Sequence, residues 1–155
     1  MATQFGLRAM LSKLIWRQRE NVWRKVLDVI LFNFRSWFFD LIYKEFTRQS
    51  FNLAVSTFMD FIQSHNLHYT SEFFDCDDFA LLFKALTSAK LNSNAVGMAL
   101  GLLCKDGTIL GGHAWNIVLI DGELYFFEPQ LCELFDVDVA KTSDGFEYIL
   151  QGVIW

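Results

Sequence analysis

The stretch HAWNIVLIDGELYFFEP, residues 113–129, predicts a β-hairpin and decides the character of the second half of the chain. Two runs rich in β-branched and aromatic residues flank Asp121–Gly122, a dipeptide that favours tight hairpin turns. His113 and Glu128 lie about equally far from this turn, so we expect them to be near neighbours at one end of a sheet. Upstream, the run AVGMALGLLC followed by the turn KDGT predicts another antiparallel strand.

The first half of the chain has helical patterns. Apolar residues recur at helical spacing from Leu7 to Ile42, and we expect two helices there with a break near residues 33–36. A third helix is expected over residues 51–63. Its apolar face ends in the polar loop SHNLHYTS.

A fourth helix should begin within FFDCDDFALLF, residues 73–83. Asp75 is a suitable N-cap, and the following aspartates suit the positive end of the helix dipole. Cys76 would then stand at or next to the first helical position. The sequence therefore predicts an α+β fold, in which N-terminal helices and the helix that carries Cys76 pack on an antiparallel β-sheet.

Length and composition limit the classes of protein. The 155 residues predict a single domain, with residues 1–50 as a helical extension and residues 51–155 as the core. A net charge of −5 argues against binding nucleic acid by phosphate neutralisation. Three cysteines without a C-x-x-C pair predict neither a disulfide framework nor a zinc cluster.

The N-terminal region has no pattern of a secretory signal, and charged residues interrupt its longest apolar run, residues 26–46. We therefore expect no transmembrane segment and a cytoplasmic or virion-associated protein. The basic, Trp-rich N-terminal region has two interpretations. It forms a surface for a membrane, a partner or self-association, or it is an amphipathic helix packed on its own domain.

Cys76, His113 and Glu128 suggest a joint chemical role. A helix N-terminus favours a thiolate, whereas the flanking aspartates oppose it, so a reactive Cys76 needs a cationic partner. A nucleophilic thiol also needs a base, and that base needs an acceptor that sets its tautomer. His113 and Glu128 are the candidates for these two roles.

The two quoted stretches resemble the papain-like and transglutaminase-like superfamily of cysteine enzymes, which show a His-Ala-Trp strand, a D-G turn and an acidic residue before proline. With Glu as third member, the resemblance is closest to the protease domain at the C-terminus of certain fungal agglutinins and to related phage and bacterial proteins. It covers about residues 50–130 and implies a papain-like core with Cys76 as nucleophile, His113 as general base and acid, and Glu128 as the residue that orients it.

The resemblance implies a cysteine-dependent acyl-transfer enzyme, a peptidase or amidase that forms a thioester with a protein or peptide substrate. The alternative is a catalytically inactive interaction or structural protein of the same fold, such as a phage protein. No lectin segment is recognisable, so sugar binding is not expected. The usual Trp after the nucleophile and a Gln shortly before it are also missing.

The chemistry requires no cofactor, but calcium or another divalent cation would suit the acidic helix start. Asp77 and Asp78 offer hard oxygen ligands, with Glu128 or Gln130 as additional candidates. The alternative is that these aspartates only stabilise the first turn of the helix and keep it solvated.

Overall fold

The computed structural model describes all residues, 1–155, as a mixed α+β fold with four helices and two antiparallel sheets. The helices are α1 (Gln4–Arg17), α2 (Val22–Arg35), α3 (Arg48–Ser64) and α4 (Cys76–Leu91). Short strands β1 (Ala2–Thr3) and β2 (Ile42–Tyr43) pair with each other. The α+β class predicted from the sequence is confirmed.

The main sheet has five strands in the order β6-β5-β4-β3-β7, all antiparallel. Their bounds are β3 (Val96–Lys105), β4 (Thr108–Ile120), β5 (Glu123–Glu128), β6 (Glu133–Asp136) and β7 (Phe146–Ile154). The predicted hairpin at Asp121–Gly122 joins β4 to β5. No strand was predicted beyond Pro129, yet this segment supplies both edges of the sheet.

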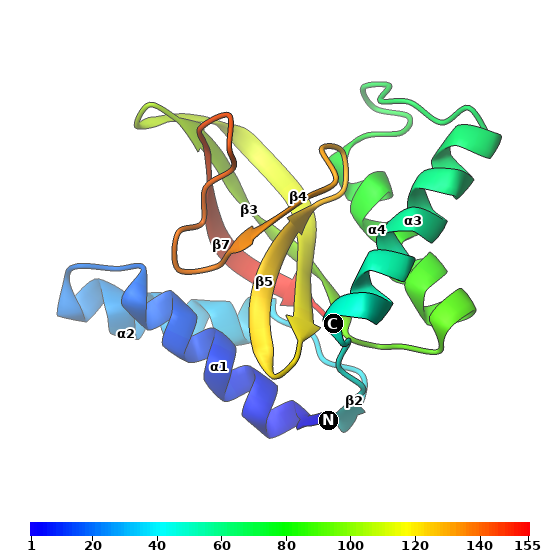
Figure 1. Ribbon diagram of the computed structural model, residues 1–155. Coiled ribbons are helices and arrows are strands. Elements are labelled where there is room, and N and C mark those ends of the chain that lie inside the picture. The colour runs from blue at the N-terminus through cyan, green and yellow to red at the C-terminus, as the bar shows by residue number, and fades with distance from the viewer.

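The helices cover the sheet from two sides (Figure 1). The α3–α4 pair lies on one side, and the α1–α2 pair lies along the other, where α2 contacts β7. Phe51, Phe58, Phe83 and Phe127 join α3, α4 and β5 through ring contacts of 4.5–6.3 Å. One core of 28 buried residues includes Leu7, Leu11 and Leu14 of α1 as well as the sheet. The division of the chain at residue 50 stays a prediction.

The break between the first two helices differs from the prediction. The structure places it at residues 18–21, and the chain leaves α2 at Arg35. The N–H of Trp37 then donates to the carbonyl of Val153, and the carbonyl of Trp37 accepts from the N–H of Trp155, each at 2.8 Å. Pairing with β7 satisfies backbone groups that would otherwise stay unbonded at this edge of the sheet, and this overrides the local helical pattern. None of the helices combines the length and apolar character that a membrane-spanning helix needs.

Candidate functional site

Cys76 is the first residue of α4, as predicted. Asp75 is the N-cap residue in an extended conformation, and its N–H donates to the Asp78 carboxylate at 3.3 Å. Opposite the helix, Asn116 of β4 donates to the carbonyl of Ala80 at 2.9 Å and holds the first turns of α4 against the sheet. The half-buried Cys76 thiol therefore occupies a defined place beside β4.

His113 of β4 and Glu128 at the end of β5 form an ion pair, with Nε2 of His113 2.7 Å from Oε2 of Glu128. Their side chains are only 10% and 2% exposed. Since β4 pairs with β5 from Asn116–Phe127 to the turn, the two residues lie just beyond the last paired positions. The prediction that the hairpin makes them near neighbours is confirmed.

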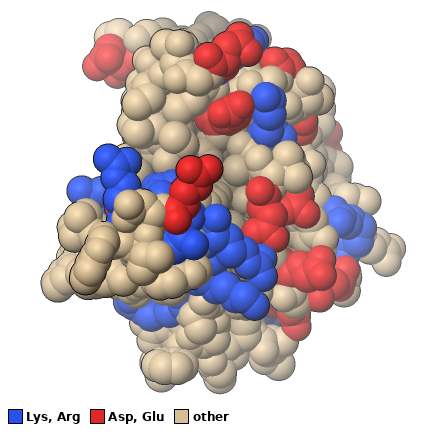
Figure 2. Space-filling view, turned by 90° about the vertical axis from the view of Figure 1, so that its left-hand side faces the viewer, with Lys and Arg blue, Asp and Glu red and all other residues tan.

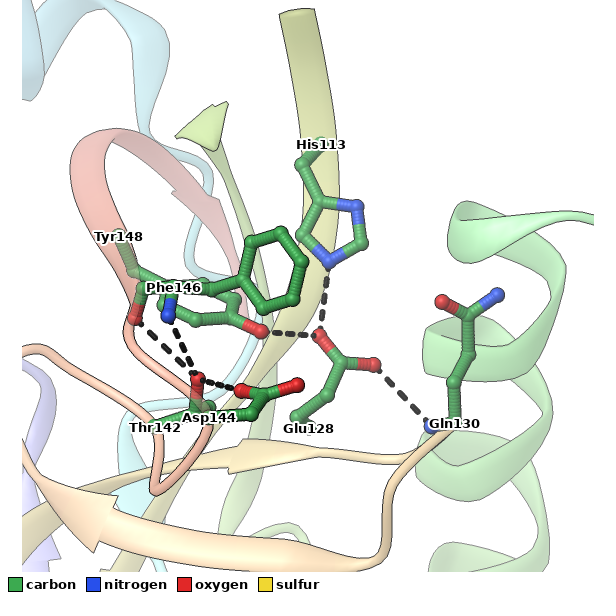
Figure 3. A network of polar contacts seen from close by, with 7 residues as sticks. All are labelled: His113, Glu128, Gln130, Thr142, Asp144, Phe146 and Tyr148. Carbon is green, nitrogen blue, oxygen red and sulfur yellow. Dashed lines mark hydrogen bonds and ion pairs between the residues drawn. The ribbon is translucent and has the colours of Figure 1, made fainter. Parts of the chain in front are cut away.

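The Glu128 carboxylate has three hydrogen-bond donors (Figure 3). Oε2 accepts from His113 and from the Tyr148 hydroxyl at 3.1 Å, whereas Oε1 accepts from the backbone N–H of Gln130 at 3.1 Å. Burying a carboxylate is costly unless its lone pairs are satisfied, and these three donors satisfy the Glu128 oxygens. Gln130 takes part through its backbone, and not through the side chain considered from the sequence.

Tyr148 is the residue of this network that the sequence reasoning missed. It lies on β7, where it pairs with Leu103 of β3, and it is buried. Burial and the charge of Glu128 raise the pKa of its hydroxyl, so Tyr148 remains a donor. The loop before β7 is ordered by Thr142, which donates to Asp144 at 2.7 Å and accepts from the N–H of Phe146 at 3.1 Å (Figure 3). The alternation of apolar residues in FEYILQGVI was the available signal for this strand.

His113 combines two opposing influences on its pKa. Burial alone would lower this pKa, but hydrogen bonding and negative charge from Cys76 and Glu128 outweigh burial and raise the pKa to about 9. Because Nε2 is bonded to Glu128, Nδ1 is the ring nitrogen that remains available to Cys76. The structure thus brings all three predicted residues together.

This arrangement can exchange a proton between a thiol and an imidazole whose orientation is set by a carboxylate. Such a thiol can react with an electrophile or hold a ligand by its sulfur. The cavity between α1 and the β5–β6 edge lies elsewhere and is lined by Lys13, Arg17 and Asp138 among others. The cluster around Cys76 is therefore distinct from that cavity.

The acidic helix start only partly matches the predicted pair of metal ligands. Asp75, Cys76 and Asp77 bring one ligand atom each within 4.8 Å of one another, whereas Asp78 bonds to the backbone of Asp75. A hydrogen bond with Asp75, with burial and nearby negative charge, raises the pKa of Asp77. A cation site at Asp77 and Asp78 stays a prediction.

The other two cysteines lie apart from this chemistry. Cys104 is 5% exposed and buried. The Cys132 thiol faces the carbonyl of Pro129 at 3.6 Å, and burial, with the charge of Glu128, raises its pKa. Neither thiol has the histidine partner that Cys76 has.

Comparison with known proteins relates this chain to lectins. Residues 52–144, more than half of the chain, match the family described as "Ricin-type beta-trefoil lectin C-terminal domain". A solved structure described as the PSL1a–E64 complex is 25% identical with a TM-score of 0.56, over 77% of this chain and 43% of that chain. No curated protein matches.

The Polyporus squamosus lectin, solved with the human-type influenza-binding epitope Neu5Acα2-6Galβ1-4GlcNAc, is 24% identical with a TM-score of 0.56. This match covers 78% of the present chain and 42% of the lectin, and it shows a shared fold. The present chain thus spans less than half of the length of either solved protein.

These matches contradict the assignment to the papain-like and transglutaminase-like cysteine enzymes, since the matching family is one of lectins. The predicted cysteine peptidase or amidase, with its acyl transfer through a thioester, is corrected accordingly, and a papain-like core is not supported. The expectation that the chain has no lectin segment is also wrong, since residues 52–144 match a lectin family. The physical reason is that a capped helix start and a D-G hairpin are local elements that unrelated folds share, so they did not specify the family.

Proposed function

This chain belongs to the ricin-type beta-trefoil lectin C-terminal domain family, and we propose that it serves in a carbohydrate-binding protein and holds a ligand of its own at Cys76, His113 and Glu128. The family makes carbohydrate, not peptide, the favoured class of partner. The four helices and five-stranded sheet show no three-fold repeat, so the ligand site proposed here is separate from a trefoil.

The observation that carries the ligand site is the buried ion pair between His113 and Glu128 at 2.7 Å beside the Cys76 thiol. A buried ion pair contributes little to stability relative to well-packed apolar residues. A pKa raised as strongly as that of His113 is typical of functional sites. The pair therefore supports a role for the neighbouring thiol.

The ligand E64 is the probe for this site. The solved structure that is 25% identical to this chain is described as a complex with E64. Cys76 is the half-buried thiol of the chain that has an imidazole partner, whereas Cys104 is buried and the pKa of Cys132 is raised by burial. We therefore assign E64 binding to Cys76.

The experiment is mass spectrometry of the intact protein after incubation with E64, followed by peptide mapping, with iodoacetamide as a second thiol probe. One adduct on Cys76 is expected, with strong loss in His113→Ala and no adduct in Cys76→Ser. The matched controls Cys104→Ser and Cys132→Ser should label like the unsubstituted protein. Equal labelling of the three cysteines would remove Cys76 as the ligand site.

The carbohydrate part of the proposal needs its own test. A glycan array with the purified chain, repeated with Cys76→Ser, separates sugar binding from the thiol site. Retention of the same glycan signal in Cys76→Ser is expected because the two sites are distinct. A complete lack of glycan binding by the purified chain would confine carbohydrate recognition to parts of the lectins that this chain does not match.

A further inference from the structure

Helix α2 presents its apolar stripe to solvent. Trp23, Leu27, Ile30 and Phe34 recur at the spacing of one helical face and are 83%, 54%, 48% and 81% exposed. Val22 and Val26 extend this face and are exposed as well. We call these six residues the α2 stripe. Contiguous exposed apolar surface of this kind marks an interaction site in a folded protein.

The inner side of α2 is held to α1 and β7 by both apolar and polar contacts. Phe32 is the one fully buried residue of the helix. Next to it, Asp28 pairs with Arg19 at 2.5 Å, and Asn33 donates to the hydroxyl of Ser12 at 3.3 Å. Phe32 and the half-buried Val29 and Leu31 thus face the domain beside polar contacts, while the larger apolar set of the helix faces outward. Packing on its own domain, one of the two interpretations of this region, does not account for the α2 stripe.

The charge around this helix pair is opposite to that of the rest of the chain. Residues 1–35 hold seven Lys or Arg and two Asp or Glu, although the whole chain has a net charge of −5. Figure 2 shows Lys and Arg side chains gathered in one band beside uncharged surface on the side where the α1–α2 turn lies. Arg24 and Arg35 are exposed at the two ends of α2 and form no salt bridge.

We propose that the α2 stripe, with its flanking Arg24 and Arg35, docks on the surface of a bilayer that contains anionic lipids. A helix that has Trp, Phe and Leu on one side and Lys or Arg along its margins lies in the bilayer interface. Its aromatic residues enter the headgroup region, and the arginines meet lipid phosphates and carboxylates. The stripe lies outside the residues that match the lectin family, so this inference goes beyond the proposed function.

The charges favour an anionic bilayer over a second copy of this chain. An antiparallel two-fold pairing through the α2 stripe would bring Arg24 of one copy near Arg35 of the other. Like charges so placed repel, whereas both arginines are attracted to a negative lipid surface.

The test is co-sedimentation of the full chain with phosphatidylcholine vesicles, with and without phosphatidylserine, at low and high salt. We expect binding that requires phosphatidylserine and weakens with salt. Trp23→Ser with Phe34→Ser should abolish it, and Arg24→Gln with Arg35→Gln should weaken it by about tenfold. The matched control is Ile109→Ser with Leu110→Ser, two exposed apolar residues of the β3–β4 hairpin, which should bind normally.

All substituted positions are exposed, and circular dichroism should show unchanged folding, so loss of binding reports on the surface itself. No binding to phosphatidylserine vesicles, or equal binding to neutral vesicles, would overturn the proposal. A dimer in light scattering that disappears in the Trp23 and Phe34 variant, in a chain that does not sediment with vesicles, would assign the stripe to a second copy instead.

Discussion

Nε2 of His113 lies 2.7 Å from a carboxylate oxygen of Glu128, and both side chains are almost fully buried. The hydroxyl of Tyr148 donates to the same oxygen at 3.1 Å. This pair joins β4 to the end of β5 and stands next to the first residue of α4. Its charge state therefore affects both the stability of the sheet edge and the thiol beside it.

The first prediction concerns the pH dependence of stability. The pKa of His113 is raised from 6.5 to about 9 in the folded protein, so folding favours the protonated ring. Its contribution is complete below pH 6.5 and is lost as the pH rises through about 9. Urea unfolding across this window should show a loss of about 2–3 kcal/mol that His113→Ala lacks.

The control for this pH dependence is His68→Ala, since His68 is an exposed loop residue that forms no ion pair. This variant should keep the same fall in the free energy of unfolding. An unchanged pH profile in His113→Ala would show that another group causes the fall.

The second prediction separates the charge of Glu128 from its shape. Glu128→Gln removes the negative charge that helps to raise the pKa of His113, while burial continues to lower it. The pKa of His113 should therefore fall, measured by NMR titration of its ring protons. Glu123→Gln, on the same strand but exposed, should leave this pKa unchanged. An equally high pKa in Glu128→Gln would mean that the contact with Cys76 alone is sufficient.

The third prediction concerns Trp115, which is fully buried and packs edge-on against Phe126 and Tyr148 at 5.4 and 5.1 Å. Its indole N–H has no hydrogen-bond partner. Trp115→Ala should cost about 3–5 kcal/mol through the cavity it leaves. Trp115→Phe should cost only about 1–2 kcal/mol because no hydrogen bond is lost. Thermal and urea unfolding measure the loss of stability in both variants. Equal losses would show that the indole N–H forms a stabilising interaction.

The fourth prediction tests the acidic start of α4 as a cation site. If Asp77 and Asp78 bind calcium, roughly tenfold excess over Kd should raise Tm by about 3–5 °C. Protons compete with calcium for Asp77, whose pKa is raised by its hydrogen bond with Asp75, so binding should strengthen as the pH rises through that pKa. Asp77→Asn with Asp78→Asn should lose the shift, whereas Asp106→Asn in the β3–β4 turn should keep it. An equal shift in both variants would place the cation elsewhere.

Local signals explain which parts of the fold were predictable. An aspartate N-cap followed by acidic residues predicted the start of α4, and Asp121–Gly122 predicted the turn between β4 and β5. Both depend on interactions within a few residues. The N-cap and turn signals therefore located Cys76, His113 and Glu128. They could not identify the family, because the family depends on how helices and strands are joined along the whole chain.

The residues that the sequence reasoning missed belong to long-range pairings. Tyr148 reaches Glu128 only because β7 returns to pair with β3, some 45 residues earlier in the chain. The segment after Arg35 is extended because Trp37 bonds to Val153 and Trp155. No local pattern contains these partners.

By itself, the sequence determined the helix that begins at Cys76 and the hairpin that brings His113 to Glu128, because capping and turn preferences act over a few residues. Only the tertiary structure decided that Tyr148 completes the carboxylate network and that α2 turns Trp23 and Phe34 to solvent. Both outcomes depend on which segments, far apart in the sequence, pack together. Local sequence patterns allow several such arrangements, and the burial of the whole core selects one of them.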